Sequence, residues 1–578
     1  MVQKNRFYFT NQENIGRFMN YWDVLLIIII FSMLFFLGWT AQQMDTPYHL
    51  GDKLPLSLSP KMLPLYAART VIRMLIALLF SIIFTFIIGI IAAKNEKAER
   101  IIIPCIDILQ SVPVLSFLSI TVIGFIQLFP GSLLGPECAA IFAIFTAQIW
   151  NIIFGFYQSL KTIPEDLKEA AAIFHLSSWQ RFFKVELPFS ISSLLWNIMM
   201  SMSASWFFVV LSEAITVNNQ NISLPGIGSY IALAIAQSNL SAVGYAILTM
   251  IIVIIIYDQI IFRPLIAWSQ KFKMEQAPDE EEYHSWLVDL VRRSKLMSLW
   301  NSYFNIFKDF VMKIHWVDFN SNKTYLKYKL SRQFNLIWHI LFFVVCITSI
   351  CFLTKFIITQ IQIYEILHVA ILGAFTALRV TILITLSSIL WIPIGVWVGL
   401  RPRVAQKIQP IIQFAAAFPA NLFYPLFVIA IVHLHLNSEI WLTPLMILGT
   451  QWYILFNVIA GASNIPRDLC LVADNFGVKG WRWWQRLALP GIFPFYITGA
   501  ITAAGGAWNA SIVAEWVSWG NTTLKATGLG EYIHASTTNG NFAQIALGTV
   551  MMSIYVLAFN HLVWRPLYRL AEERFHFN

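Results

Sequence analysis

Residues 74–93 read MLIALLFSIIFTFIIGIIAA, a run of twenty residues without a single charged side chain. A helix of about 20 apolar residues is long enough to cross the roughly 30 Å hydrocarbon core of a bilayer. The whole chain of 578 residues is 58% hydrophobic and 12% charged, whereas soluble domains carry about 25% charged residues. This charge deficit excludes a single soluble globule and predicts an integral membrane protein.

The same length criterion predicts an all-α protein with twelve transmembrane helices in two groups of six. The first group is expected near residues 22–40, 66–93, 101–127, 137–158, 190–216 and 240–263. The second group is expected near residues 334–361, 366–400, 408–436, 440–460, 491–517 and 541–566.

The two groups are copies of one another. At an offset of 306 residues, Arg73 matches Arg379 and Pro113 matches Pro419; at an offset of 302, the match extends to the pairs Trp206/Trp508 and Glu213/Glu515. A four-residue difference in length between the copies, near the third and fourth spans, accounts for the change from one offset to the other. Because six is an even number, both copies enter and leave on the same side, which predicts parallel repeats related by an axis along the membrane normal.

Basic residues give the orientation of the spans. With the N-terminus inside, 32 of the 39 Lys and Arg residues lie in connections on the cytosolic side, so both termini are expected there. The expected domains are residues 1–265, a cytosolic linker at 266–333, and residues 334–578. The net charge of +9 is spread over short loops rather than along one stripe, which argues against nucleic acid as a partner. Within the linker, Trp-rich residues 285–318 suit either an interfacial helix or a plain connector.

A polar loop of about 30 residues follows the fourth span of each copy, at 159–189 and 461–491, longer than a turn between helices requires. Nine of the 27 positions in 163–189 are identical to those in 465–491. Pro164 suits the start of a short helix, and Glu165 and Asp166 favour its positive end. Each loop is expected to hold a short helix and then a second helix ending at a Leu-Pro pair.

These loops resemble a motif of permease subunits of bacterial ABC importers: Glu-Ala-Ala, a glycine four residues later, then a hydrophobic residue and Leu-Pro. Glu169, Ala170 and Ala171 fit the first copy, although His175 stands where the family has glycine. The second copy has Gly477, but residues 471–473 read LVA in place of Glu-Ala-Ala. The resemblance implies a type I importer fold and a coupling helix in each loop that docks on an ATPase. The implied coupling residues are Pro164, Asp166, Glu169, Ala170, Ala171, His175, Leu187, Pro188, Pro466, Asp468, Asp474, Gly477, Leu489 and Pro490.

A second motif narrows the resemblance. Trp206 to Glu213, followed by Pro225-Gly226-Ile227-Gly228, is similar to the Trp…Ala-Glu…Gly-Leu-Gly pattern of the nitrate, sulfonate and taurine branch, and residues 508–530 repeat it. That branch implies a small anionic solute and, here, two permease domains fused in one chain. The residues themselves do not distinguish nitrate from bicarbonate, an alkylsulfonate or an aromatic acid.

The resemblance also implies partners and a location. The expected partners are two cytosolic ATPase subunits, a periplasmic or lipid-anchored substrate-binding protein, and membrane lipid, with the chain in the bacterial inner membrane. The sequence contains no Gly-x-x-x-x-Gly-Lys-Ser/Thr loop, so we expect no catalytic residues, metal site or bound cofactor in this chain, and ATP and Mg²⁺ on the ATPase subunits.

Several residues are candidates for the solute path or its gate. Charged groups inside spans are costly, and Arg73 and Arg379 could face one another as a positive field for an anion, or pair with carboxylates between helices. Glu213 and Glu515 suit a structural or gating role, and Glu137 suits simple anchoring at the interface. Pro113 and Pro419 are expected to kink the third spans, either to shape a gate or for packing. The tryptophans of the second motif, Trp206 and Trp508, are further candidates.

Two other classes of protein compete with the importer. An ion-coupled secondary transporter also has twelve spans in two halves, but it does not require the long paired loops ending at Leu187-Pro188 and Leu489-Pro490. A membrane scaffold or sensor without transport has no positive support in the residues.

Overall fold

A computed structural model describes residues 20–42, 44, 46–49, 54–217, 220–269, 286–294, 343–345 and 347–574. The described chain is mostly helical, with two short β-hairpins. Both ends of the chain and most of the predicted linker at 266–333 lie outside the described residues. The expected cytosolic position of the termini therefore stays a prediction.

The first half is built from long helices joined by short ones. Its elements are α1 (Tyr21–Gln42), α2 (Leu63–Lys94), α3 (Glu96–Ser111), α4 (Val114–Leu128), α5 (Leu134–Lys161), α6 (Glu165–Ile173), α7 (Ser178–Arg181), α8 (Leu187–Ser212), β1 (Ala214–Val217), β2 (Gln220–Ser223), α9 (Ile227–Ala236), α10 (Leu240–Tyr257) and α11 (Arg263–Ser269). From the linker the structure describes α12 (Trp286–Arg293), which packs against α1.

The second half repeats this order from α2 onward. A helix at Phe343–Gln360 precedes α15 (Ile363–Gly399), α16 (Pro402–Ala417), η5 (Ala420–Phe423), α17 (Tyr424–His433), α18 (Ser438–Trp441), η6 (Thr443–Met446), α19 (Gln451–Ser463), α20 (Arg467–Asn475), α21 (Trp481–Trp483), α22 (Leu489–Ala514), β3 (Trp516–Trp519), β4 (Thr522–Lys525), α23 (Leu529–Asn539), α24 (Phe542–Phe559) and α25 (Arg565–Arg574). Both hairpins are antiparallel, with Ala214 opposite Ser223 and Trp516 opposite Lys525.

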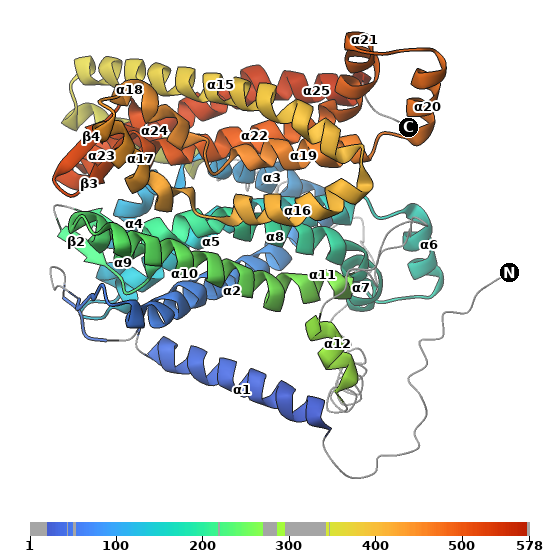
Figure 1. The fold of residues 1–578 in the computed structure, drawn as a ribbon, viewed down its shortest axis with the longest axis horizontal. Helices are drawn as coiled ribbons and strands as arrows, with labels where there is room; N and C mark the ends of the chain where they lie inside the picture. The colour runs from blue at the N-terminus through green and yellow to red at the C-terminus, as the bar shows by residue number, and fades with distance from the viewer. Residues whose placement is uncertain are drawn as a thin grey trace, which may run out of the picture.

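The two halves lie side by side as layers (Figure 1), the first in blue and green and the second in yellow to red. Both hairpins lie at one end of the bundle, here called the hairpin end. The helix pairs α6/α7 and α20/α21 lie at the opposite end, here called the short-helix end. In each half three helices form the core: α2, α5 and α8 in the first, and α15, α19 and α22 in the second.

The structure confirms a mostly helical chain with many candidate spans. Among the described residues, eight helices are long and apolar enough to cross a membrane, and two bent pairs raise the number to ten if each pair is one span. The second half's third predicted span bends by 74° between α16 and α17, and its fourth bends by 45° between α18/η6 and α19. The first half's third predicted span is divided into α3 and α4, each shorter than a full span. The total of twelve transmembrane helices stays a prediction.

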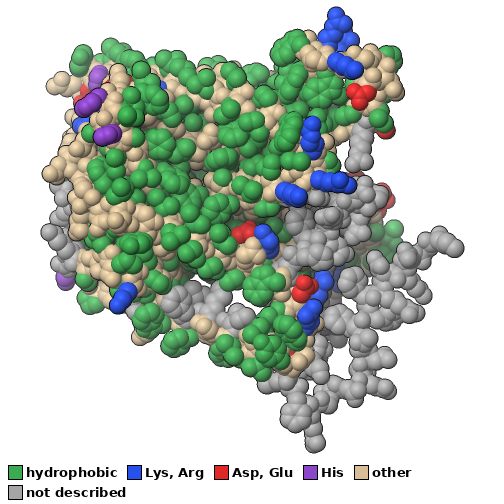
Figure 2. All heavy atoms as spheres, viewed as in Figure 1, with side chains coloured by type: hydrophobic (Ala, Val, Ile, Leu, Met, Phe, Trp, Pro, Cys, Tyr) green, Lys and Arg blue, Asp and Glu red, His purple; other side chains and the backbone are tan. Residues whose placement is uncertain are grey.

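The outer surface suits a bilayer. Leu79, Ile83 and Ile87 follow one another at helical spacing on α2 and are 57%, 46% and 54% exposed, as side chains in contact with lipid would be. Figure 2 shows apolar side chains over the middle of one face, with most of its visible Lys and Arg toward the short-helix end.

Candidate functional site

A buried cluster of one arginine and two glutamates lies at the hairpin end of the first half. Arg73, on α2, donates from Nε to Glu137 Oε2 at 2.6 Å and from Nη2 to Glu137 Oε1 at 2.7 Å. Its Nη1 donates to Glu213 Oε1 at 2.6 Å. The three side chains are 0%, 1% and 0% exposed. We call Arg73, Glu137 and Glu213 the first clamp; it joins α2, the first turn of α5 and the end of α8.

The first clamp also fixes the start of α9. Glu213 Oε2 accepts a hydrogen bond from the backbone N–H of Gly228 at 2.7 Å. Its Oε1 accepts another from the Thr70 hydroxyl at 2.7 Å, and Thr70 Oγ1 accepts from the Ile227 N–H at 3.1 Å. The carboxylate thereby satisfies backbone donors at a helix N-terminus, where a negative charge is favoured.

The two glycines of the second motif are needed for this contact. A Cβ on Gly226 would lie 2.3 Å from the Glu213 carboxylate, and a Cβ on Gly228 would lie 2.0 Å from the backbone oxygen of Val210. Any side chain at either position would therefore push α9 away from α8. This close approach gives a physical reason for the pattern of Glu followed by Gly-x-Gly. Trp206, two turns before Glu213, is 1% exposed and packs edge-on against Tyr257 at 5.6 Å.

The second half repeats the cluster with more exposure; we call Arg379, Glu439 and Glu515 the second clamp. Arg379 Nη2 donates to Glu439 Oε2 at 2.5 Å, and Nη1 donates to Glu515 Oε1 at 3.1 Å. Glu515 again accepts from Thr376 Oγ1 and from the Gly530 N–H, at 2.9 and 2.7 Å. Glu439 is 43% exposed and Arg379 is 13% exposed, so this clamp is open to its surroundings where the first clamp is sealed.

The two clamps show what the arginines contact. Arg73 and Arg379 each form ion pairs with carboxylates of their own half. This arrangement matches the prediction that they pair with carboxylates between helices, rather than the prediction that they face one another across a path. Glu137 was wrongly interpreted as an interfacial anchor, since it is buried against Arg73. The repeat contained the missing signal, because Glu137 and Glu439 are also 302 residues apart.

Pro113 and Pro419 mark breaks rather than kinks. Pro113 precedes α4, which packs against α22 and α24 of the other half. The break frees the Val114 N–H, which donates to Asn509 Oδ1 of the second half at 2.9 Å, because a backbone donor within a membrane needs an internal partner. On either side of Pro419, Phe418 and Leu422 join the apolar core of the first half. Each half therefore inserts part of its third predicted span into the other.

The short helices of the two predicted loops have the same geometry. Pro164 and Pro466 are the extended N-cap residues of α6 and α20, and Asp166 and Asp468 lie in the first turns. Ala171 and Ala473 are buried at 3% and 9% exposure. One face of each helix is thus anchored and the other is free.

The second helix of each loop does not end at the Leu-Pro pair. In the first half α7 continues through a π-helical turn, η2 (Phe182–Glu186), into α8, whose first turn contains Leu187 and Pro188. In the second half α21 continues through η7 (Trp484–Ala488) into α22, which begins at Leu489 and Pro490. Proline has no backbone N–H to donate, and each proline follows a π-helical turn, where the regular i→i−4 ladder is already interrupted. The prediction of a separate helix ending at each proline was wrong.

His175 and Gly477 occupy the same strained backbone position. Both follow the short helix of their half, α6 or α20, with positive φ, 48° for His175 and 64° for Gly477. This left-handed conformation costs a non-glycine residue about 1–2 kcal/mol, which explains why the family places glycine here. In the first half, His175 adopts this conformation, so the first half bears this cost in folding free energy.

The substitution His175→Gly is expected to stabilise the protein by about 1 kcal/mol, because it removes the left-handed strain at an exposed position. Thermal unfolding in detergent checks this, with Gly477→Ala as the matched control that is expected to lose a similar amount. A His175→Gly protein that unfolds at or below the wild-type temperature would contradict the strain argument.

Comparison with known proteins gives the family. The model for "Binding-protein-dependent transport system inner membrane component" matches twice, at residues 85–263 and 391–572, which together exceed half of the chain. The chain belongs to this family. The double match confirms that two permease domains are fused in one chain, as the repeat predicts.

Each individual relative matches a stretch of this chain about as long as one permease domain. A nitrate import permease protein of Leptolyngbya laminosa is 26% identical over 185 residues, covering 32% of this chain and 63% of the relative. A glycine betaine transport system permease protein of Bacillus subtilis is 29% identical over 192 residues, covering 33% and 63%. A bicarbonate transport system permease protein of Synechococcus elongatus is 24% identical over 185 residues, covering 32% and 60%. The matched region spans about three fifths of each relative.

Proposed function

We propose that this chain is the permease of an ATP-driven importer in the bacterial inner membrane, with the short-helix end in the cytosol. The observation that carries the proposal is the pair of equivalent exposed aromatic residues at the ends of α6 and α20. Phe174 and Phe476 are 76% and 80% exposed, each directly before the left-handed position. Large apolar side chains held out at a polar end of a membrane protein are typical of a surface that another protein covers.

The partners follow from the two ends of the bundle. Two ATPase subunits, which would hold ATP and Mg²⁺, would receive Phe174 and Phe476, and movement of α6 and α20 would tilt the spans through the rigid connections at η2 and η7. A periplasmic or lipid-anchored binding protein would deliver solute at the hairpin end. Membrane lipid would cover the apolar flanks.

The solute is proposed to be a small oxyanion or carboxylate. Relatives are named for nitrate, bicarbonate and glycine betaine, which share negatively charged oxygens on a compact molecule. Arg73 and Arg379 are committed to glutamates, so the charge that recognises the solute would belong to the binding protein rather than to these arginines. Uptake of labelled nitrate, bicarbonate and betaine by a deletion strain, with and without the gene, tests the class.

The two docking helices are proposed to be chemically unequal. Glu169 is exposed on α6, and the equivalent residue on α20 is Leu471, 60% exposed. A charged contact with the ATPase is thus available to the first helix and an apolar contact to the second.

Glu169→Ala is therefore expected to reduce stimulation of the ATPase several-fold, because hydrogen bonds to charged groups are worth about 1.5–3 kcal/mol. Leu471→Ala is expected to have a smaller effect, and the measurement is ATP hydrolysis by the purified complex in liposomes. Equal losses for the two substitutions would remove the asymmetry.

The ion-coupled secondary transporter remains the competing function. A secondary transporter would keep taking up solute after ATP depletion and would stop when ion gradients are dissipated. An ATP-driven importer would stop after ATP depletion and would continue when ion gradients are dissipated.

A further inference from the structure

The tip of the β3–β4 hairpin crosses from the second half to the first. The hairpin turns through Gly520 and Asn521, between paired Trp519 and Thr522. The Gly520 N–H donates to the Ile235 backbone oxygen at 2.9 Å, near the end of α9. A Cβ on Gly520 would lie 2.1 Å from Ser238 Oγ. Gly520 also has a φ of 56°, so both its conformation and its closeness to α9 require glycine.

The base of this hairpin is fastened to its own half. The Trp516 indole stacks on the His534 imidazole with 5.0 Å between centroids. Lys525 Nζ also lies over the Trp516 ring, 3.7 Å from its centroid, and 3.6 Å from Glu531 Oε1. Burial, with a smaller contribution from the Lys525 charge, lowers the pKa of His534 to about 4, so the stacked imidazole is neutral at neutral pH.

The first half lacks this fastening. The positions equivalent to Trp516, Lys525 and His534 are Ala214, Ser223 and Ala232. These small side chains provide neither an aromatic stack nor a cation–π contact. The bases of the two hairpins are therefore fastened differently. The first hairpin nevertheless also reaches the other half, since β1 contacts α23 and Ile215 and Ile222 belong to a buried cluster made mostly of second-half residues.

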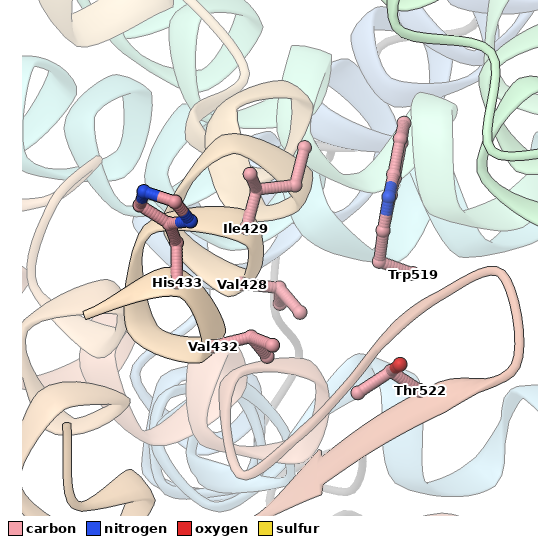
Figure 3. A pocket seen from close by; sticks show the side chains of 6 residues that line it. All are labelled: Val428, Ile429, Val432, His433, Trp519 and Thr522. Carbon is pink, nitrogen blue, oxygen red and sulfur yellow. The ribbon is translucent and has the colours of Figure 1, made fainter. Parts of the chain in front are cut away.

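Trp519 connects the tip to both halves. Its side chain is partly buried and packs against the apolar cores of the first and the second half. On one side it borders a cavity of about 270 Å³, whose other lining residues are Val428, Ile429, Val432, His433 and Thr522. Figure 3 shows open space between Trp519 and the α17 valines. The tip thus makes close contact with α9 but borders a cavity on the side of α17. This cavity leaves room for the Trp519 side chain to move.

We propose that the β3–β4 hairpin is a latch that holds the two halves together at the hairpin end. It stays attached to α23 through Trp516 and His534, and it releases α9 when Gly520 separates from Ile235 and Trp519 shifts into the cavity. This release would open the bundle to solute, a consequence that rests on the proposed ATP-driven import.

Hydrogen exchange on the full chain in liposomes tests the latch directly. Gly520→Ala is expected to increase exchange about tenfold in the α9 peptide 229–240, which belongs to the other half, because the left-handed conformation and the Ser238 contact both oppose a side chain. The matched control is Gly131→Ala. Gly131 also has positive φ, 77°, but a Cβ there would meet just the His49 ring, at 3.8 Å. Peptide 229–240 is expected to keep its wild-type exchange in this control.

A second variant keeps the test valid if Gly520→Ala fails to fold. Trp519→Val gives the tip the residue that the first hairpin has at Val217, and it leaves the backbone unchanged. It is expected to accelerate exchange in 229–240 by a smaller factor. Unchanged exchange in 229–240 in the folded variants would overturn the latch.

ATP hydrolysis by the complex separates the latch from the proposed function. A released latch in an importer is expected to raise hydrolysis several-fold in the absence of binding protein. Faster exchange in 229–240 without any ATP hydrolysis by the complex would support the latch and contradict the importer.

Discussion

Arg73→Ala is expected to prevent the accumulation of folded protein. Removing the guanidinium leaves the carboxylates of Glu137 and Glu213 buried, at 1% and 0% exposure, without the group that forms ion pairs with both. Breaking a buried ion pair by removing one partner typically costs about 3–5 kcal/mol, a large share of the stability of an ordinary domain. The measurement is the yield of monodisperse protein after detergent extraction, followed by size-exclusion chromatography.

The second clamp provides a matched control within the same chain. Arg379→Ala leaves Glu515, 2% exposed, without its cation, but the other partner, Glu439, is 43% exposed and can be solvated. Exposed ion pairs are worth about 0–1 kcal/mol, so one of the two carboxylates costs little, and the Arg379→Ala protein is expected to lose less stability than the Arg73→Ala protein. Equal yields from Arg73→Ala and Arg379→Ala would show that burial does not govern the clamps.

The next largest effect is expected from Gly228→Ala. The added Cβ would lie 2.0 Å from the Val210 backbone oxygen, which cannot rotate away as a side chain could. Displacing α9 would also break the hydrogen bond from the Gly228 N–H to Glu213. Overpacking alone typically costs 1–3 kcal/mol, and loss of this charged hydrogen bond adds about 1.5–3 kcal/mol. Thermal unfolding and solute uptake are both expected to show the loss.

Gly244→Ala is the control for this substitution. Gly244 lies inside α10, and a Cβ there would meet nothing within 4 Å. Alanine is the better helix former by about 1 kcal/mol, so this variant is expected to unfold at the wild-type temperature or above it. If Gly228→Ala were as stable as Gly244→Ala, the close approach of α8 and α9 would not be required.

The sequence predicts those parts of the fold that depend on local periodicity and on repetition. Apolar runs of about 20 residues locate most of the long helices, and the repeat predicts that α20 mirrors α6. Proline at an N-cap and glycine at a left-handed position are local requirements, so the geometry around Pro164 and Gly477 could be predicted.

Contacts between distant segments could not be predicted from local pattern. Glu137 lies at a span end, where anchoring at the interface explains a carboxylate as well as an ion pair with Arg73 does. Pro113 alone does not reveal that Asn509, 395 residues after Val114, accepts the Val114 N–H that the break releases. The contact of Trp519 with the apolar core of the other half depends on how distant segments pack, which no periodicity records.

ATP hydrolysis by the tagged full chain, purified from its native membranes, tests most directly whether the chain is the permease of an ATP-driven importer. We expect an ATPase to copurify at two subunits per chain. We also expect the double substitution Phe174→Ala/Phe476→Ala to remove this ATPase while the chain retains its elution volume and unfolding temperature. A chain that purifies without ATP hydrolysis, and whose solute uptake survives ATP depletion but not the loss of ion gradients, would contradict this function.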